Sequence, residues 1–260
     1  MSESRETYDR LWRDSWGDLQ RLGPVHRHQR EALLARVREL GVHTVLDVGC
    51  GSGDNLSALA TLPSLTLTGV DVSPEALALA RQRVPSATLL ELDVERQRLP
   101  QRFDLVMSFQ VIEHIADDVA ALTHMAQMAD QWVLVTSMCG RMRPSEKHIG
   151  HLRNYTFEEL RDKAERAGLK VVDLFGWGFP FYSPLYRTMI EWLPGGPPSG
   201  PMTPTARLVA GLLNTLYKLN VPRRGDVVTL LARPFGGSRS GVRGETRGPS
   251  DASPSSRSAP

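Results

Sequence analysis

From residue 44 onwards, short apolar runs alternate with segments in which apolar residues recur every three or four positions. The runs are rich in Val, Leu and Thr and predict strands at 44–48, 65–70, 87–92, 103–108, 131–136, 170–175 and 226–232. The intervening segments predict helices over 54–62, 75–84, 117–128 and 156–167. Strands that alternate with helices predict an α/β fold, in which helices cover both faces of a mostly parallel sheet.

Residues 1–40 precede the first strand and carry apolar and aromatic residues at helical spacing. We expect this segment to form a helical lid over a ligand pocket or to pack on the sheet edge. Residues 41–235 form the α/β domain. Residues 236–260 consist mainly of Gly, Ser, Arg and Pro and are expected to be a disordered tail.

The stretch 176–224 replaces a short connection between the last two predicted strands. It is aromatic and contains eight prolines, which keep it from being one helix. Within it, residues 205–219 place Ala206, Val209, Leu212, Leu213 and Leu216 on one apolar stripe. The stretch is interpreted as a substrate cap with an apolar pocket. A dimer contact, a membrane-surface helix and a helix that covers the sheet are the alternatives.

Composition narrows the class of protein. The net charge of +2 comes from the tail, where four Arg stand against Glu245 and Asp251, so the rest of the chain is neutral. This balance argues against a nucleic-acid partner. Two cysteines make a disulfide framework unfavourable, and no apolar stretch is long enough for a signal segment or a membrane span. We expect a soluble, cytoplasmic protein whose oligomeric state is open.

The first predicted strand ends in Asp47 and a loop with Gly49, Gly51 and Gly53, and a helix then starts at Asp54. Such a loop allows a small ligand to approach the backbone at a helix N-terminus. A dinucleotide-binding loop needs a small residue where Asp54 stands, and an acid there would repel a pyrophosphate. Asp47, just before the loop, suits a cationic ligand instead.

Two further acids, Asp71 and Asp93, end the second and third predicted strands. The carboxyl ends of strands are where open α/β sheets bind ligands. Asp71 is placed to accept hydrogen bonds from ribose hydroxyls, and Asp93 is placed to accept one from an adenine amino group. Three acids beside a Gly loop therefore outline a groove of adenosine shape.

The pattern D-x-G-x-G-x-G from Asp47 resembles the first motif of class I S-adenosylmethionine-dependent methyltransferases. The segments Phe103-Asp-Leu-Val and Val111-Ile-Glu-His114 are similar to later motifs of that family. The resemblance implies a Rossmann-like, seven-stranded sheet with an antiparallel last strand and S-adenosylmethionine as cofactor. It implies that the cofactor is bound by Asp47, Gly49, Gly51, Gly53, Asp71, Val72, Asp93, Val94, Phe109 and Gln110.

His114 is expected near the methyl donor, where it would act as a base or would order its loop by hydrogen bonds. Some quinone O-methyltransferases have E-x-x-E-H at this position and can hold a divalent ion there. This chain has Gln110 in place of the first Glu, and a neutral amide is a poorer ligand for a hard cation. We therefore expect no metal.

The segment Gly150-His-Leu-Arg153-Asn-Tyr155 follows the fifth predicted strand and resembles a loop of bacterial methyltransferases of this kind. His151 is a second candidate base. The candidate substrate residues are His148, Arg153, Tyr155 and Trp177. The alternative is that His151, Arg153 and Tyr155 only pin the loop to the sheet.

The resulting hypothesis is a methyltransferase that acts on an oxygen, nitrogen or carbon atom of a small, partly apolar molecule. The alternatives are a nicotinamide-dependent oxidoreductase, a non-catalytic cofactor-binding protein and an enzyme that performs other chemistry on the same fold. The motifs do not identify the acceptor.

Overall fold

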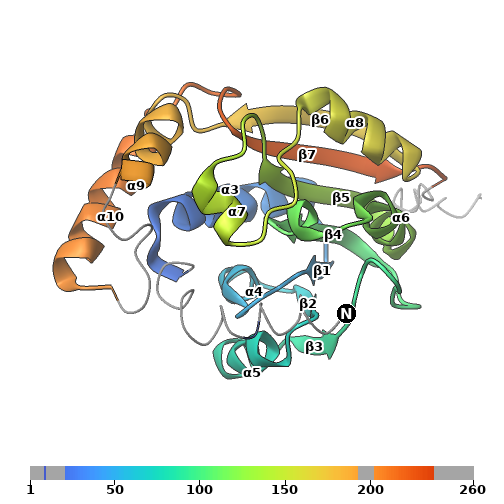
Figure 1. Cartoon of the computed structure of the whole chain (residues 1–260). Helices are drawn as coiled ribbons and strands as arrows, with labels where there is room; N and C mark the ends of the chain where they lie inside the picture. The colour runs from blue at the N-terminus through green and yellow to red at the C-terminus, as the bar shows by residue number, and fades with distance from the viewer. Residues whose placement is uncertain (1–8, 10–20, 193–201, 237–260) are drawn as a thin grey trace, which may run out of the picture.

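A computed structural model describes residue 9, residues 21–192 and residues 202–236. Seven strands form one sheet in the order β3-β2-β1-β4-β5-β7-β6 (Figure 1). Their bounds are β1 Thr44–Val48, β2 Thr66–Asp71, β3 Thr88–Glu91, β4 Phe103–Phe109, β5 Ala129–Met138, β6 Leu169–Trp177 and β7 Val227–Pro234. Strands β1 to β5 pair in parallel, and β7 is antiparallel to both β5 and β6. The predicted sheet is confirmed.

Two hydrophobic cores lie on opposite faces of the sheet because successive side chains of a strand point to opposite sides. Val45 of β1 belongs to the core with Leu33 and Leu56, whereas Leu46 belongs to the core with Leu122. The helices over the first face are α3 Pro24–Leu40, α4 Asp54–Leu59 and α5 Pro74–Arg83. Those over the second face are α6 Asp118–Met128 and α8 Phe157–Arg166.

The predicted N-terminal helix is interrupted within the described residues. Gly23 has an extended ψ of 139°, and α3 starts at Pro24 immediately after it. Proline fits the first turn of a helix but disfavours helical backbone in the residue before it. The expectation of continuous helix across this point is therefore wrong. Residues 1–8 and 10–20 of the expected lid lie outside the described residues, and so does the expected disordered tail except for Gly236.

The segment 137–152, which follows the fifth predicted strand, is partly regular. β5 continues to Met138, and a short helix, α7 Pro144–His148, follows. Pro144 occupies the first helical position, and the Glu146 side chain accepts a hydrogen bond from the Arg143 backbone N–H at 2.8 Å. These are local N-terminal signals, but the helix is too short to show a periodic pattern.

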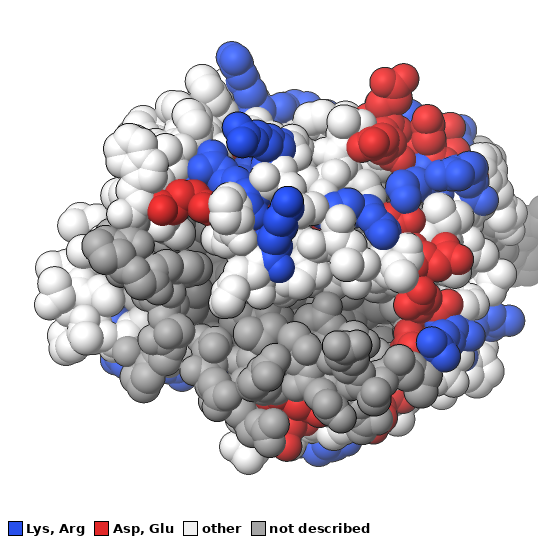
Figure 2. Space-filling view, viewed as in Figure 1, with Lys and Arg blue, Asp and Glu red and all other residues white. Residues whose placement is uncertain are grey.

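The insertion after β6 forms an irregular helical turn, η2 Phe181–Tyr186, and two helices, α9 Arg187–Trp192 and α10 Pro204–Tyr217. α10 packs on α3 and η2 through Ala210, Asn214 and Tyr217. The predicted apolar stripe coincides only in part with the packing face, since Val209 and Leu212 are exposed whereas Ala206, Leu213 and Leu216 are half-buried. Figure 2 shows little charge over α9 and α10. This exposed apolar surface agrees with two of the earlier interpretations, a dimer contact and a membrane-surface helix.

Among the described residues, none of the helices combines the length and the apolar character needed to cross a bilayer. Cys50 and Cys139 are both buried free thiols.

Candidate functional site

The glycine loop follows β1 at the switch point of the sheet, where β2 and β4 pair with β1 on its two opposite sides. Gly49, Gly51 and Gly53 have φ values of 73°, 53° and 77°, which glycine adopts without strain. A Cβ on Gly49 would lie 2.4 Å from a methyl carbon of Val111. The loop therefore requires glycine at residue 49 for its backbone conformation and for its close contact with the segment after β4.

Asp47 is the most unusual acid of the chain. Its side chain is 1% exposed, and neither carboxylate oxygen has a hydrogen-bond partner among the described residues. Burial raises its pKa well above the ordinary value, and the nearby Asp71 raises it further. A buried carboxylate without a partner is costly unless a ligand completes it. Asp47 therefore fits a cationic group such as the ammonium or the sulfonium of S-adenosylmethionine.

Asp71 holds the loop to β2. Its carboxylate accepts hydrogen bonds from the backbone N–H groups of Gly51 at 2.8 Å and Ser73 at 2.9 Å. Burial raises its pKa, and these hydrogen bonds counteract the rise. A carboxylate has about four acceptor positions, so these contacts leave capacity for further donors. The role toward ribose hydroxyls stays a prediction.

From the sequence, an unpaired negative charge was expected on Asp54, but the carboxylate of Asp54 is paired with Arg83. Arg83 donates to Asp54 at 2.7 Å and also reaches the carbonyl and the hydroxyl of Ser52. The acid at the start of α4 is thus neutralised by a residue of α5. Repulsion of a pyrophosphate by Asp54 is correspondingly weaker than the sequence suggested. The stronger discrimination comes from Asp47.

The remaining predicted cofactor residues surround the same edge. Asp93 is half-buried, accepts from the Glu95 backbone N–H at 3.1 Å and pairs with Arg96 at 3.2 Å. Gln110 has a left-handed backbone with φ of 58° and donates its N–H to the Thr136 carbonyl at 2.9 Å. Val72 and Phe109 are half-buried, and Val94 is buried.

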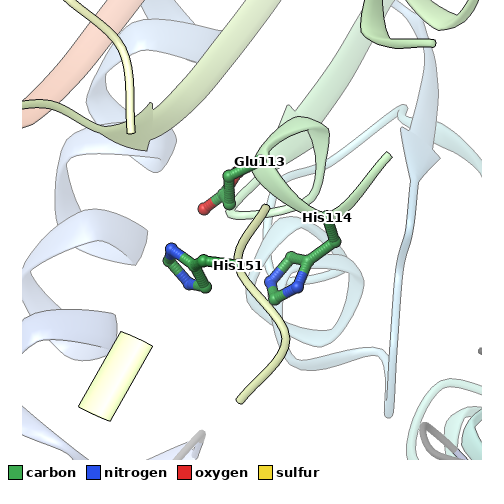
Figure 3. A group of neighbouring side chains, drawn as sticks. All are labelled: Glu113, His114 and His151. Carbon is green, nitrogen blue, oxygen red and sulfur yellow. The ribbon is translucent and has the colours of Figure 1, made fainter. Parts of the chain in front are cut away.

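A second cluster consists of Glu113, His114 and His151, whose side chains point toward one another (Figure 3). Glu113 and His114 belong to the short helix η1 Ile112–His114 after β4, and His151 follows α7. One ligand atom of each side chain lies within 4.8 Å of the others. The two imidazole rings meet edge to face with centroids 4.6 Å apart. The structure thus brings together the two histidines that the sequence singled out.

Burial dominates the electrostatics of this cluster. It raises the pKa of Glu113 to about 7, and it lowers the pKa of His114 to about 4. It also lowers the pKa of His151. Ser137 donates its hydroxyl to Glu113 Oε2 at 2.8 Å, whereas Oε1 has no hydrogen-bond partner among the described residues. Glu113 directly precedes His114 in the motif Val111-Ile-Glu-His114, and it is the one member of the cluster that was not among the predicted site residues.

An ion pair and two hydrogen bonds in succession determine the tautomer of His151. Arg187 pairs with the buried Glu146, whose carboxylate also accepts from Asn154 Nδ2 at 2.9 Å. Since a carboxylate only accepts, the amide of Asn154 must direct its oxygen to His151 Nδ1, 3.3 Å away. His151 therefore carries its proton on Nδ1, and the Nε2 lone pair remains to act as an acceptor or a ligand.

The other predicted substrate residues have different surroundings. Tyr155 is 1% exposed and donates its hydroxyl to Asp118 at 2.8 Å. Arg153 also donates to Asp118 and to the carbonyls of Ile115 and Ala116. These contacts match the alternative in which both residues pin the loop. His148 is exposed and lies outside the cluster.

Trp177, at the carboxyl end of β6, belongs to an aromatic group that the sequence did not reveal. His28 of α3 stacks on Trp177 with ring centroids 4.2 Å apart. Tyr182, Tyr186 and Tyr217 continue the group through edge-to-face and stacked contacts. The insertion thus forms an aromatic wall at the sheet edge that also carries the glycine loop.

The family described as "Methyltransferase domain" matches residues 45–131. A Trans-aconitate 2-methyltransferase of Klebsiella pneumoniae (strain 342) is 28% identical over 180 residues, which cover 63% of this chain and 70% of that protein. An S-adenosylmethionine-dependent methyltransferase from Clostridium acetobutylicum ATCC 824 superimposes with a TM-score of 0.54 at 12% identity, covering 81% of this chain and 92% of that one. The [4+2]-cyclase SpnF superimposes with a TM-score of 0.63 at 16% identity, covering 90% and 97%.

The matched segment contains the glycine loop, Asp71, Asp93 and the η1 residues of the second cluster. Together with the sheet order, it identifies the chain as a class I S-adenosylmethionine-dependent methyltransferase. Its cofactor is S-adenosylmethionine, which decides against the nicotinamide-dependent alternative.

Proposed function

We propose that this methyltransferase acts on a heteroatom of a small, partly apolar molecule, which lies between the cluster of Glu113, His114 and His151 and the aromatic wall at Trp177. The observation that carries the proposal is the convergence of three ionisable side chains from two separate segments, of which Glu113 and His151 are buried and His114 is half-buried. The segments leave β4 and α7 at the edge of the sheet where the cofactor residues lie.

Bound S-adenosylmethionine supplies a methyl group that the sulfonium has already activated. The contribution of the chain is therefore mainly positioning and exclusion of water. Asp47, Asp71 and the glycine loop hold the cofactor. His114 and His151 hold the reacting atom of the acceptor, and His151 presents the Nε2 lone pair to it. Asp93, Val72, Val94, Phe109 and Gln110 complete the cofactor groove.

The charge distribution favours an acceptor that is not a polycarboxylate, in contrast to the substrate in the names of the curated relatives. Arg153 lies close to the carboxylate of Asp118, and Arg187 lies close to those of Glu146 and Asp226. Arg153 and Arg187 are thus neutralised. The half-buried Trp177 and Tyr182 of the wall instead offer apolar surface to an aromatic or aliphatic acceptor.

The test measures S-adenosylhomocysteine release by the full chain with a panel of phenols, aliphatic alcohols, amines and carboxylic acids, including trans-aconitate. We expect turnover with an apolar member that carries one reacting heteroatom. Trp177→Ala should raise its KM at least tenfold, because it removes apolar contact, while the affinity for S-adenosylmethionine stays unchanged. Preference for trans-aconitate over every apolar acceptor would overturn the proposal.

A further inference from the structure

We propose that Glu113, His114 and His151 form a binding site for one divalent transition-metal ion. The carboxylate and the two imidazoles place one ligand atom each within 4.8 Å of the others (Figure 3). In a tetrahedral site with bonds of about 2.0–2.2 Å, ligand atoms lie roughly 3.3 Å apart. Side-chain rotations that move these atoms by about an ångström therefore close the set around an ion.

Glu113 provides the strongest single observation. Its side chain is fully buried, and its Oε2 atom is satisfied by Ser137. The other oxygen, Oε1, has no hydrogen-bond partner among the described residues. A buried polar atom without a partner is costly and requires an explanation, of which an ion is one. The free oxygen belongs to the residue that stands next to both imidazoles.

His151 is held in the form that a metal requires. Asn154 accepts the proton of Nδ1, so Nε2 keeps its lone pair in the neutral ring. Metal-bound histidines commonly donate their second ring N–H to such a neighbour, which fixes the tautomer and the ring orientation. Asn154 is itself held by Glu146, and the backbone N–H of His151 donates to the Glu146 carbonyl at 3.0 Å.

Backbone contacts keep the two segments of the site together. The N–H of Leu152 donates to the Glu113 carbonyl at 2.9 Å, and the His114 imidazole is hydrogen-bonded to the backbone of Gly150. The residues on both sides of His151 are thus tied to η1. The site is therefore built on a fixed junction.

The donor set selects the kind of ion. Two imidazoles and one carboxylate suit zinc and the neighbouring transition metals, whereas calcium and magnesium prefer oxygen ligands alone. Three protein ligands leave at least one coordination position open. This role rests on the proposed function, since the open position would take the acceptor heteroatom and lower its pKa. A bound ion would then do what a histidine base would otherwise do.

This inference revises the expectation of no metal. That expectation rested on Gln110, which replaces an acid of the linear motif. The structure supplies the third ligand from His151 instead, a residue of another loop. The linear pattern could not pair these residues.

The test uses the full chain after chelation and dialysis, with Co²⁺ as a spectroscopic probe and Zn²⁺ as its competitor. We expect one Co²⁺ per chain, visible absorption typical of a low-coordinate site, and complete displacement by one equivalent of Zn²⁺. Glu113→Gln and His151→Asn should each weaken binding at least tenfold. His148→Ala, which removes an exposed imidazole three residues from His151, is the matched control and should bind as the wild type does.

Affinity for S-adenosylmethionine, measured on each variant, reports whether the domain is still folded. The metal proposal is overturned if the folded wild type takes up no Co²⁺. It is equally overturned if Glu113→Gln and His151→Asn bind as tightly as His148→Ala does. Metal binding needs no acceptor, so failure to find a substrate would leave this proposal standing. Conversely, methyl transfer that is unchanged after chelation would show that the ion has no part in catalysis.

Discussion

The Oδ1 atom of Asn154 lies 3.3 Å from Nδ1 of His151, and this contact sets the tautomer of the imidazole. The Asn154 amide is in turn oriented by the buried Glu146, which pairs with Arg187. The segment after α7 thus carries a histidine whose tautomer depends on the buried ion pair of Glu146 and Arg187. The orientation depends on three residues outside the cluster itself.

Asn154→Ala should release His151 from the Nδ1–H tautomer. The alanine cannot accept the proton, so both tautomers become populated. Nitrogen NMR of the imidazoles should show this change for His151 and none for the exposed His148. Loss of such a supporting contact commonly costs about 10–100-fold in activity or metal affinity. An unchanged His151 spectrum would mean that Asn154 does not set the tautomer.

Asp47→Asn should stabilise the protein at neutral pH and weaken cofactor binding. Burial, together with Asp71, raises the folded-state pKa of Asp47 well above its ordinary value. A carboxyl whose pKa rises on folding contributes stability below the pKa of the unfolded chain, and this contribution is lost as the pH rises from about 4. Removing the charge should return about 1–3 kcal/mol at pH 8.

Denaturant unfolding at pH 5 and pH 8, with calorimetric titration of S-adenosylmethionine, measures both effects. Asp104→Asn is the contrasting control, since the Asp104 carboxylate accepts from the backbone N–H groups of His43 and Thr44 at 2.9 Å each. That substitution should destabilise the fold. If Asp47→Asn lost stability and kept full cofactor affinity, the assignment of Asp47 would be wrong.

Asp118→Asn should destabilise the loop that carries His151. Burial alone would raise the pKa of Asp118, but hydrogen bonds from Lys163, Tyr155 and Arg153 hold it below its ordinary value. A carboxylate with a depressed pKa contributes stability above the unfolded-state pKa, and this is lost as the pH falls through the folded-state value. We expect a loss of about 2–3 kcal/mol near pH 7.

Thermal unfolding between pH 3 and pH 7 tests this expectation. The wild type should lose stability toward pH 3 more steeply than Asp118→Asn, because the variant has no carboxylate to protonate there. Parallel curves for the two proteins would assign the acid sensitivity to other groups.

Gly49→Ala should be more damaging than Gly41→Ala. Both glycines have positive φ, 73° and 63°, so each alanine carries the backbone cost of roughly 1 kcal/mol. Only at Gly49 does the new Cβ meet another residue, Val111, at 2.4 Å. That overlap should add about 1–3 kcal/mol and lower cofactor affinity. The double variant Gly49→Ala with Val111→Ala should recover the steric part alone, which chemical unfolding measures. If the double variant recovered no stability, the destabilisation by Gly49→Ala would not arise from overlap with Val111.

The seven strands were predictable because each apolar run is local and is bounded by polar or turn residues. The predicted helix boundaries were wrong where a helix is too short to show a periodic pattern or where a local backbone signal interrupts that pattern. α7 spans Pro144–His148, too few residues for a period, and the helix expected through residue 23 is interrupted by the Gly23–Pro24 junction. On α10 the apolar stripe did not show which side packs on the protein, because Leu212 of the stripe is exposed and Asn214 outside it is buried. Periodicity reports amphipathic character, but the neighbouring elements decide which face is covered.

The sequence by itself determined the sheet, the glycine loop and the acids at the strand ends, because β–α units place those residues at one edge by local rules. Only the tertiary structure decided which charges are neutralised and which side chains meet. Asp54 is paired with Arg83, Asp47 has no hydrogen-bond partner among the described residues, and Glu113 is brought to His151 from another loop. Such relationships depend on how separate segments pack, since burial and pairing are properties of surroundings that the linear order does not contain.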